Sequence, residues 1–303
     1  KLCGYVVGQS GDGAGRCPDQ AQQASQRPKL MHLMWVEGLT ILGLWARNPA
    51  FFAIVPQYSK DVLVSDVMIT APASNEDFPG RDIVFPSHNT DGVNIESCRN
   101  VLLQRLFIDN GDDCVAIYSG SNLQGRVVNQ TTQGVHVRDV HCGHGHGFAI
   151  GSRTAAGISD VLFENVACVG SWKCVRFKSC RGRGGLVTNV TFQGVRASNV
   201  QYAVHADLLY KDLPPTNRSA TPVFERLTIR DMRAEGTRAG VLVRGLPEAP
   251  LDLAMDNVVV ETQGDSFTCD DAVCHLHNVK VLPVHSSGGE GQQRLLPSSV
   301  MFA

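Results

Sequence analysis

The chain has 303 residues, of which 43% are hydrophobic and 18% are charged, and its formal net charge is −2. This composition is that of an ordinary folded protein and excludes a disordered chain. The sequence contains no run of about 18 apolar residues, so no transmembrane helix is expected. We expect neither a membrane nor a nucleic-acid partner.

One short pattern recurs along the chain. Each copy begins with Asn, Asp or a substitute, continues with alternating apolar residues and ends with a second short apolar pair. Second strand-like runs, such as VAIYSG, GFAIGS, VRFKSC and GVLVRG, lie between the copies. The copies occupy residues 38–45, 61–69, 100–108, 134–142, 160–168, 189–197, 226–234 and 257–262, with a partial copy at 278–283.

These repeats predict an all-β fold, a parallel β-helix or solenoid. Two or three short strands per repeat, without a helical period and with Gly or Asn at the joints, are typical of that architecture, in which stacking completes the core. A β-sandwich would show more hairpin turns such as Asn-Gly. We expect residues 1–303 to form a single domain with an irregular tail at 284–303, and we interpret the apolar run at 30–35 as the core of a rung.

Four clusters carry the residue types that chemistry uses, and each lies at a strand end or joint. They are SHNTDGVNI (87–95), NGDDC (110–114), GHGHGFAIGS (143–152) and VRFKSC (175–180). In a solenoid, sites about one repeat apart stack along one face. The residues expected to converge are therefore Asp91, Asp112, Asp113, His146, Arg176 and Lys178.

Several carboxylates at one place suit glycosidic cleavage, which needs a protonated acid and a base. Crowding like charges raises the pKa of one member and divides these roles. Asp112 and Asp113 are adjacent, so a regular strand would point them to opposite faces. If both act, the backbone must bend there, and the preceding Gly111 is consistent with a bend.

A block without acidic residues, from 165 to 206, contains six cations and indicates an anionic ligand. Within it, Arg176 and Lys178 are spaced i, i+2 and share one face of a strand, which suits a carboxylate-bearing sugar. The plainer readings are a solvated basic face, a turn role for Asp91 and a buried structural role for His146. GHGHG matches no zinc-site spacing, so we expect no metal and no cofactor.

Ten cysteines and three N-x-[ST] sequons favour an oxidising, secreted context. Because Asn189 begins a repeat strand, we expect it to stack inside, which makes Asn129 and Asn217 the better glycosylation candidates. No signal peptide begins at Lys1, so we expect a mature form or a fragment. Cys269 and Cys274 are near in sequence and are expected to pair.

Taken together, NTDG, GDDC, GHG…IGS and RFK resemble the four signature segments of the polygalacturonases, glycoside hydrolase family 28. The resemblance runs from about Gly11 to about Asn278. It implies a right-handed parallel β-helix that hydrolyses α-1,4-galacturonosyl bonds in pectin with inversion. The family normally has further strands before the segment that Gly11 begins, so the chain is expected to lack the usual N-terminal rungs.

The resemblance also implies roles for individual residues. Asp112 resembles the general acid, Asp91 and Asp113 the pair that activates water, and His146 the residue that supports the protonation of the acid. Arg176, Lys178 and Tyr210 resemble the residues around the substrate carboxylate. Asn89 resembles the cleft asparagine of NTD. Cys114 and Cys142 match a family disulfide next to the site.

The chain departs from the usual family motifs at four positions, which are Asn94, Tyr118, Ala149 and Phe177. Phe177 replaces an inward isoleucine and is expected to alter packing, whereas Tyr118 replaces Lys or Asn and is expected to alter a subsite. Segment 121–134 is longer than usual and is expected to wall one end of the cleft. RGRGG (181–185) and NIESC (94–98) favour the exo-acting branches.

We therefore expect a secreted, monomeric pectin hydrolase whose partner is anionic polysaccharide, with exo action somewhat favoured. The alternatives are a non-catalytic pectin-binding β-helix and a hydrolase of substituted pectin such as xylogalacturonan. His146 disfavours a rhamnogalacturonan hydrolase. A calcium-dependent pectate lyase would need a calcium-binding acid cluster with a catalytic Arg or Lys, and acids beside a His and two cations suit hydrolysis better.

Overall fold

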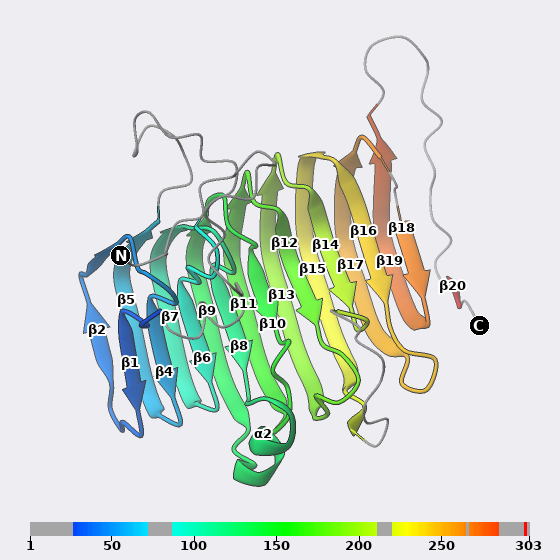
Figure 1. Cartoon of the computed structure of the whole chain (residues 1–303). Coiled ribbons are helices and arrows are strands. Elements are labelled where there is room, and N and C mark those ends of the chain that lie inside the picture. Colours follow the sequence, from blue (N-terminus) through cyan, green and yellow to red (C-terminus); the bar gives the residue numbers. More distant parts are fainter. Residues whose placement is uncertain (1–26, 72–86, 211–219, 265–266, 285–299, 302–303) are drawn as a thin grey trace, which may run out of the picture.

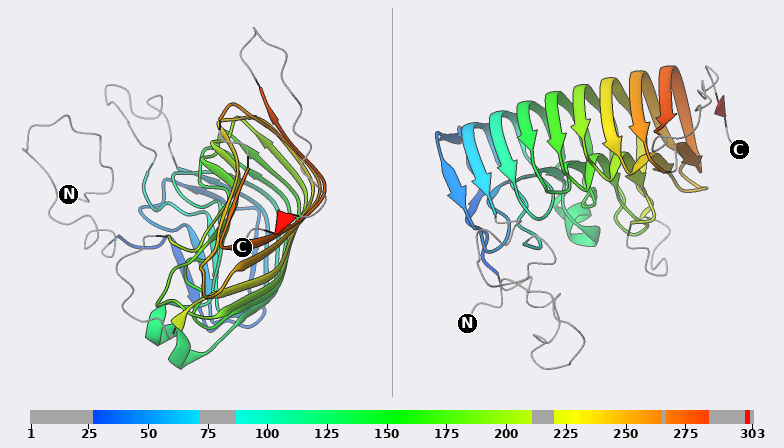
Figure 2. Two further views of the ribbon diagram at one scale, coloured as in Figure 1. Left: turned by 90° about the vertical axis from the view of Figure 1, so that its right-hand side faces the viewer. Right: turned by 90° about the horizontal axis from the view of Figure 1, so that it is seen from above.

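The computed structural model describes residues 27–71, 87–210, 220–264 and 267–284, together with 300 and 301. These residues form a stack of parallel strands in which successive rungs follow one another in chain order (Figure 1; Figure 2). The predicted parallel β-helix is confirmed. No described helix is long and apolar enough to cross a membrane.

A nine-stranded sheet forms one side of the stack, and every pair in it is parallel. Its strands are short and become almost fully buried in the middle of the stack. In order they are β1 (Met31–Met34), β4 (Ile54–Gln57), β6 (Val93–Glu96), β8 (Val115–Tyr118), β10 (Phe148–Ile150), β12 (Lys173–Lys178), β14 (Tyr202–Asp207), β16 (Ala239–Arg244) and β18 (Phe267–Asp270).

An eleven-stranded sheet forms the rest of the wall. Its main path runs through β2 (Thr40–Leu42), β5 (Lys60–Thr70), β7 (Arg99–Asp109), β9 (Thr132–Cys142), β11 (Ile158–Val169), β13 (Leu186–Ser198), β15 (Val223–Thr237), β17 (Leu251–Thr262), β19 (Ala272–Pro283) and β20 (Val300–Met301). The strand β3 (Trp45–Arg47) pairs with β5. β20, within the predicted tail, pairs antiparallel with β19.

The Asn, Asp and Gly residues of the repeat turn out to be backbone corners. In β5, for example, Asp61 and Asp66 have φ of 54° and 58°, and equivalent pairs five residues apart recur through β15. Asn, Asp and Gly adopt this left-handed region more readily than other residues. The second corner interrupts the ladder, as between Ser65↔Gln104 and Val67↔Leu106, and bends each long strand.

Side chains at these corners bond between rungs on the outside of the stack. Asn189 belongs to this set: it is exposed and donates to Asp160 Oδ1 at 2.6 Å. The expectation that Asn189 lies inside the stack was therefore wrong, because an inward side chain is incompatible with its place at a corner. Asn165 and Asn257 donate to Asp139 and Asp231 in the same way.

Alternating apolar residues from both sheets fill the interior. Phe163 and Phe192 stack at 4.3 Å between ring centroids, and Phe177 meets Phe192 edge-on at 5.7 Å. Phe177 is fully buried, as its inward position predicted. A larger ring at this position therefore changes the packing between two rungs rather than the outer face.

Two sequence interpretations need correction. In the run 30–35, Met31 and Leu33 are half-buried, but Leu30, Met34 and Trp35 are exposed, because alternation along β1 turns every second side chain outward. The copy at 257–262 is the second half of β17, since Val258 pairs with Met232. Its first half contains Asp252, which stands in register with Arg226, the start of the preceding copy, because Leu227 pairs with Leu253. Unlike Arg226, Asp252 does not adopt the left-handed conformation.

Candidate active site

The turns before β6, β8 and β10 bring the predicted residues together. Asp91, Asp113 and His146 each lie two residues before the mutually paired Val93, Val115 and Phe148, so the three residues stand in one column across three rungs. Arg176 and Lys178 follow on β12, the next strand, and share its outer face as their spacing predicted.

A tight turn presents Asp112 and Asp113 to the same site. The Gly111 N–H donates to Thr90 Oγ1 at 3.0 Å, and a Cβ on Gly111 would overlap the backbone of Ser87. The Asn110 side chain donates to the carbonyl oxygens of Thr90 and Asp113. The glycine is needed here for space, and the bend lets two adjacent carboxylates avoid opposite faces.

Asp112 lies between a histidine and an amide. His146 Nδ1 lies 3.0 Å from its Oδ1, and Asn89 Nδ2 donates to its Oδ2 at 3.1 Å. The side chains of Asp112 and His146 are 17% and 19% exposed, so both reach solvent. Burial alone would raise the pKa of Asp112, but the hydrogen bond and charge of His146, with the charges of Lys178 and Arg176, hold this pKa well below its usual range.

Asp113 is fully buried in an ion-pair cluster. Arg176 donates to its Oδ1 at 3.0 Å and Lys178 to its Oδ2 at 2.5 Å. The ring of Tyr210 lies 5.2 Å from the Arg176 guanidinium carbon and 5.4 Å from Lys178 Nζ. Both cations expected to bind substrate are therefore engaged by Asp113 in the free protein.

Asp91 is buried beside two other acids. Its Oδ2 accepts from Asn94 at 3.0 Å and lies 3.3 Å from Tyr118 Oη, whereas its Oδ1 is buried without a hydrogen-bond partner. Burial, then the charges of Asp112 and Asp113, raise the pKa of Asp91 well above 3.8. Asp91 thus retains a proton more readily than Asp112 in the free protein.

Tyr118 covers the buried pair of acids. Its Oη also lies 3.4 Å from Asp113 Oδ2, and burial together with the charges of Asp91 and Asp113 raises the pKa of this phenol. Arg153 lies over the Tyr118 ring at 4.5 Å and bonds Glu96 at 2.9 Å. The sequence marked Tyr118 as unusual, but it did not predict these contacts with both acids.

The same cluster has the donor types for a cation. Asp112, Asp113 and His146 each offer an atom within 4.8 Å of the others. A divalent ion there would meet Arg176 and Lys178, which already neutralise Asp113, so repulsion opposes its binding. The donor set therefore fits proton transfer better than metal binding.

The predicted cysteine pairs are bonded in the structure. Cys114–Cys142 closes a separation of 28 residues directly after Asp113, and Cys269–Cys274 closes one of five. A third bond, Cys168–Cys174, joins the end of β11 to the start of β12. The sequence left this pairing open, although the two cysteines flank a single turn.

Segment 121–134 contains Asn129, the one glycosylation candidate that the structure describes. Asn129 is exposed at the C-terminal end of α2 (Asn122–Val128), whereas Asn217 lies outside the described residues. Arg126 in α2 donates to the carbonyl oxygens of Gly182 and Arg183, so the helix lies beside the turn that follows β12 (Figure 1). The expectation that this segment walls one end of the cleft stays a prediction.

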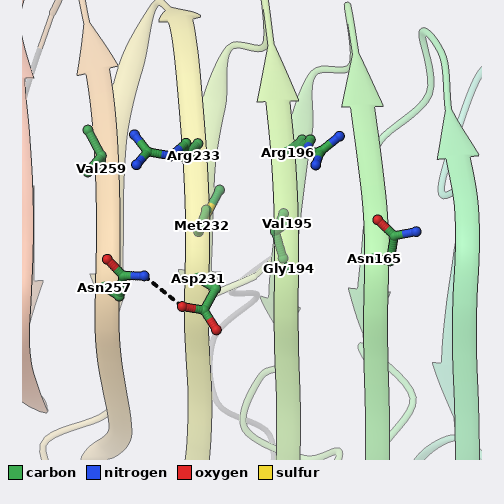
Figure 3. Close-up of a pocket in the computed structure, with 9 residues that line it drawn as sticks. All are labelled: Asn165, Gly194, Val195, Arg196, Asp231, Met232, Arg233, Asn257 and Val259. Atoms are coloured by element: carbon green, nitrogen blue, oxygen red, sulfur yellow. Dashed lines mark hydrogen bonds between the residues drawn. The ribbon is translucent and has the colours of Figure 1, made fainter.

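Two pockets lie on the eleven-stranded sheet instead. One, of about 280 Å³, is lined by Arg196, Arg233 and the bonded pair Asp231 and Asn257, among others (Figure 3). The other, of about 430 Å³, shares both arginines. Neither has the clustered buried acids of the nine-stranded sheet. The acid-free block therefore divides its cations between two faces.

Comparison with known proteins points to one family. The family model of glycosyl hydrolases family 28 matches residues 8–280. This chain belongs to that family. It is 28% identical over 283 residues to a probable polygalacturonase of Vitis vinifera, covering 88% of this chain and 54% of the relative. It is 25% identical over 264 residues to a polygalacturonase of Ralstonia solanacearum, covering 78% of this chain and 48% of the relative.

Solved structures share the fold. An exopolygalacturonase from Thermotoga maritima superposes with a TM-score of 0.68 at 23% identity, covering 82% of this chain and 52% of that one. A polygalacturonase from Erwinia carotovora gives the same score and identity, with 82% and 60% covered. The family 28 chain described here thus spans about half the length of the curated relatives above.

Proposed function

We propose that this chain hydrolyses the α-1,4-galacturonosyl bonds of pectin, with homogalacturonan as substrate. The observation that carries the proposal is the gathering of three carboxyl groups, a histidine and two cations on one face of the nine-stranded sheet. Proton transfer to a leaving oxygen, activation of water and binding of a sugar carboxylate need these groups together.

We assign the general acid to Asp112, because it is the most solvent-accessible of the three acids and has an imidazole beside it. Its pKa in the free protein is too low for that role. Arg176 and Lys178 contribute to the lowering. A substrate carboxylate bound to these cations would offset their charge, and so raise the pKa of Asp112 when the substrate is in place.

Binding of the substrate carboxylate to Arg176 and Lys178 would also prepare the acids that activate the attacking water. Once a sugar carboxylate binds Arg176 and Lys178, it replaces Asp113 as a partner of these cations. An oxygen of Asp113 can then accept a hydrogen bond from the water. The unpartnered Oδ1 of Asp91 is the second oxygen that we assign to the water. Before it acts as a base, Asp91 gives its own proton to Asp112, whose pKa the bound substrate raises, and Asp112 then carries this proton to the leaving oxygen. The phenol of Tyr118 lies between Asp91 and Asp113.

We propose inversion at the anomeric carbon. The resemblance to the family motifs supports inversion, but the nearest oxygens of Asp112 and Asp113 lie within 4.8 Å. That spacing is shorter than the roughly 6.5–9.5 Å typical of inverting carboxyl pairs. We favour inversion because Asp91 supplies a second oxygen, so the water need not lie between the adjacent acids.

We further propose exo action, which Tyr118 and its neighbours favour. Arg153 lies over Tyr118 and also over Phe52 at 5.5 Å, so this cluster fills the outer face near β4 and β8. Arg27 donates to Asn89 Oδ1 and the carbonyl of His88 on the same side. A polymer would have little room to continue past the acids in this direction.

The three disulfides of the described residues support an extracellular location, because such bonds persist in oxidising compartments. We propose that the protein is secreted and meets pectin outside the cell.

A second candidate function is pectin binding without catalysis. The observation in its favour is the burial of Asp91 and Asp113 beneath Tyr118, at 2% and 0% exposed. Water must reach these groups for hydrolysis. Binding of polygalacturonate without release of reducing ends, by protein shown to be folded, would select this alternative.

Proton NMR of the first product from trigalacturonate tests both hydrolysis and stereochemistry. Inversion predicts that the β-anomer appears first and then mutarotates. Initial α-anomer would contradict inversion but support hydrolysis. Absence of product would contradict the proposed hydrolysis.

A further inference from the structure

The column of site residues continues one rung beyond His146. Lys173 lies two residues before Val175, which pairs with Phe148, so it occupies the position of His146 on the next rung. The Trp172 N–H donates to the carbonyl of Gly145 at 2.9 Å, which continues the ladder through the turn. The fold thus places Trp172 and Lys173 beside the acids, although neither residue belongs to the four family motifs.

Lys173 is a buried cation without a carboxylate partner. Its residue is 8% exposed, and among the described residues it has no hydrogen bond or ion pair; its Nζ lies over the Trp172 ring at 4.5 Å. Burial, then the charges of Arg176 and Lys178, lower its pKa to about 8. Buried lysines are normally paired, so this arrangement costs stability in the free protein.

His205 supplies an unused polar atom next to it. It pairs in register with Arg176, and its Nδ1 is buried without a hydrogen-bond partner. Burial, then the charge of Lys173, lower the pKa of His205 to about 4, so the ring is neutral near pH 7. Because Nδ1 is closed to solvent, a sugar hydroxyl or carboxylate can bond it only after the His205 ring turns, and the tautomer decides whether the nitrogen donates or accepts.

Trp172 adds an apolar face. It is 47% exposed, and its ring meets that of His146 edge-on at 5.0 Å. An exposed aromatic ring beside polar groups suits stacking against the C–H face of a sugar. The three side chains therefore offer a charge, a hydrogen-bonding atom and a platform.

We propose that Trp172, Lys173 and His205 form a further subsite, which binds an unesterified uronate residue next to the sugar held by Arg176 and Lys178. This inference rests on the proposed function. Lys173 pairs with the uronate carboxylate, His205 bonds the sugar and Trp172 stacks against it. A methyl-esterified residue would lose the ionic contact, so the subsite selects for free carboxylate.

A purely structural role for Lys173 makes a different prediction about stability. Because its pKa is lowered from 10.5 to about 8, the cost of charging it is present in full below pH 8 and disappears as the pH rises toward 10.5. Lys173→Met should therefore keep or raise the Tm near pH 6. A lysine needed for packing or bonding would instead lower the Tm when replaced.

Calorimetric titration in an Asp112→Asn background tests the subsite, using trigalacturonate and its fully methyl-esterified form. Adding Lys173→Met should weaken binding of the free acid about tenfold, the loss expected for one charged hydrogen bond, and leave the ester unchanged. Lys173→Arg should restore most of the affinity. Arg196→Met, which removes an exposed cation on the eleven-stranded sheet, is the matched control and should bind like the parent.

Equal affinity of the parent and the Lys173→Met variant for trigalacturonate would overturn the subsite alone. Equal weakening toward acid and ester, with a lower Tm, would also overturn it in favour of a structural role. If the parent binds neither oligomer, both the subsite and the proposed function fail.

Discussion

Asp91, Asp112 and Asp113 carry the same carboxyl group, but each has different partners. Asp113 bonds two cations, Asp112 an imidazole and an amide, and Asp91 an amide beneath a phenol. The environments of Asp91 and Asp112 move their pKa values in opposite directions, as a site with acid and base roles requires. The free protein favours a proton on Asp91 over Asp112, and under the proposed function the bound substrate shifts this preference toward Asp112.

The acid assignment predicts that Asp112→Asn lowers kcat on polygalacturonate by about 10²–10⁴-fold, because an amide cannot donate a proton to the leaving oxygen. Reducing-end release measures the rate, and circular dichroism checks that the fold is intact. Asp252→Asn, at a partly exposed carboxylate paired with His275, is the control. A folded Asp112→Asn variant with the wild-type rate would show that the acid lies elsewhere.

The burial of Asp91 predicts that replacing this acid maintains or raises stability but removes activity. Since the pKa of Asp91 is raised, its contribution to stability is fully present below pH 3.8 and is lost as the pH rises through the folded pKa. Asp91→Asn should remove this loss, giving a Tm equal to or above that of the wild type near neutral pH, and should abolish turnover. Thermal melts across pH measure the effect, and parallel Tm curves for both proteins would contradict it.

Sequence predicted the residues whose motifs and repeat spacing place them in the site, including both cations through their i, i+2 spacing. It could not predict that Arg176 and Lys178 both bond Asp113, because that depends on side-chain packing across rungs. The sequence analysis counted Lys173 only as one of the six cations of the acid-free block and did not single out His205. Their proposed role depends on polar atoms that are buried without a partner. Burial of that kind has no recognisable pattern in the amino-acid sequence.

At the scale of elements, the turn before β8 decides where two acids point, and the Cys114–Cys142 bond anchors it. A loop of this length predicts that replacing both cysteines by serine lowers the free energy of unfolding by about 3–4 kcal/mol, against about 2 kcal/mol for the shorter Cys269–Cys274 loop. Because Cys114 directly follows Asp113, only the first variant should also lose activity.

Denaturant unfolding and reducing-end release on the two double variants check this prediction. Equal losses of stability, together with full activity in both variants, would show that the Cys114–Cys142 bond does not position the acids.

The strands themselves were predictable because apolar alternation and corner residues repeat together. The Asn and Asp residues that begin the copies adopt the left-handed backbone conformation at the corners. Because these residue types favour that conformation, their spacing in the sequence fixes the period of the fold. The sequence interpretation of β17 missed its first half, although Asp252 stands there in register with Arg226, the start of the preceding copy. The sequence interpretation was also wrong for part of β1, because hydrophobicity alone did not distinguish inward from outward side chains.

At the scale of the whole molecule, the stacking of the rungs brings turns from different rungs together into one surface. Residues from position 91 to position 178 meet there because consecutive rungs are adjacent. Tyr118, Arg153 and Phe52 then fill the outer face beside β4 and β8. This asymmetry supports the proposal of cleavage near a chain end, and it arises from the assembled stack, independently of the motifs RGRGG and NIESC.

The most direct test of the central claim is a time course of products from unsubstituted polygalacturonate and purified protein, with a chelator present. We predict release of reducing ends as monomer or dimer, without new ultraviolet absorbance from unsaturated sugars. A ladder of oligomers would contradict exo action and leave hydrolysis standing. New absorbance from unsaturated sugars, or no release of reducing ends by folded protein, would contradict hydrolysis by this cluster.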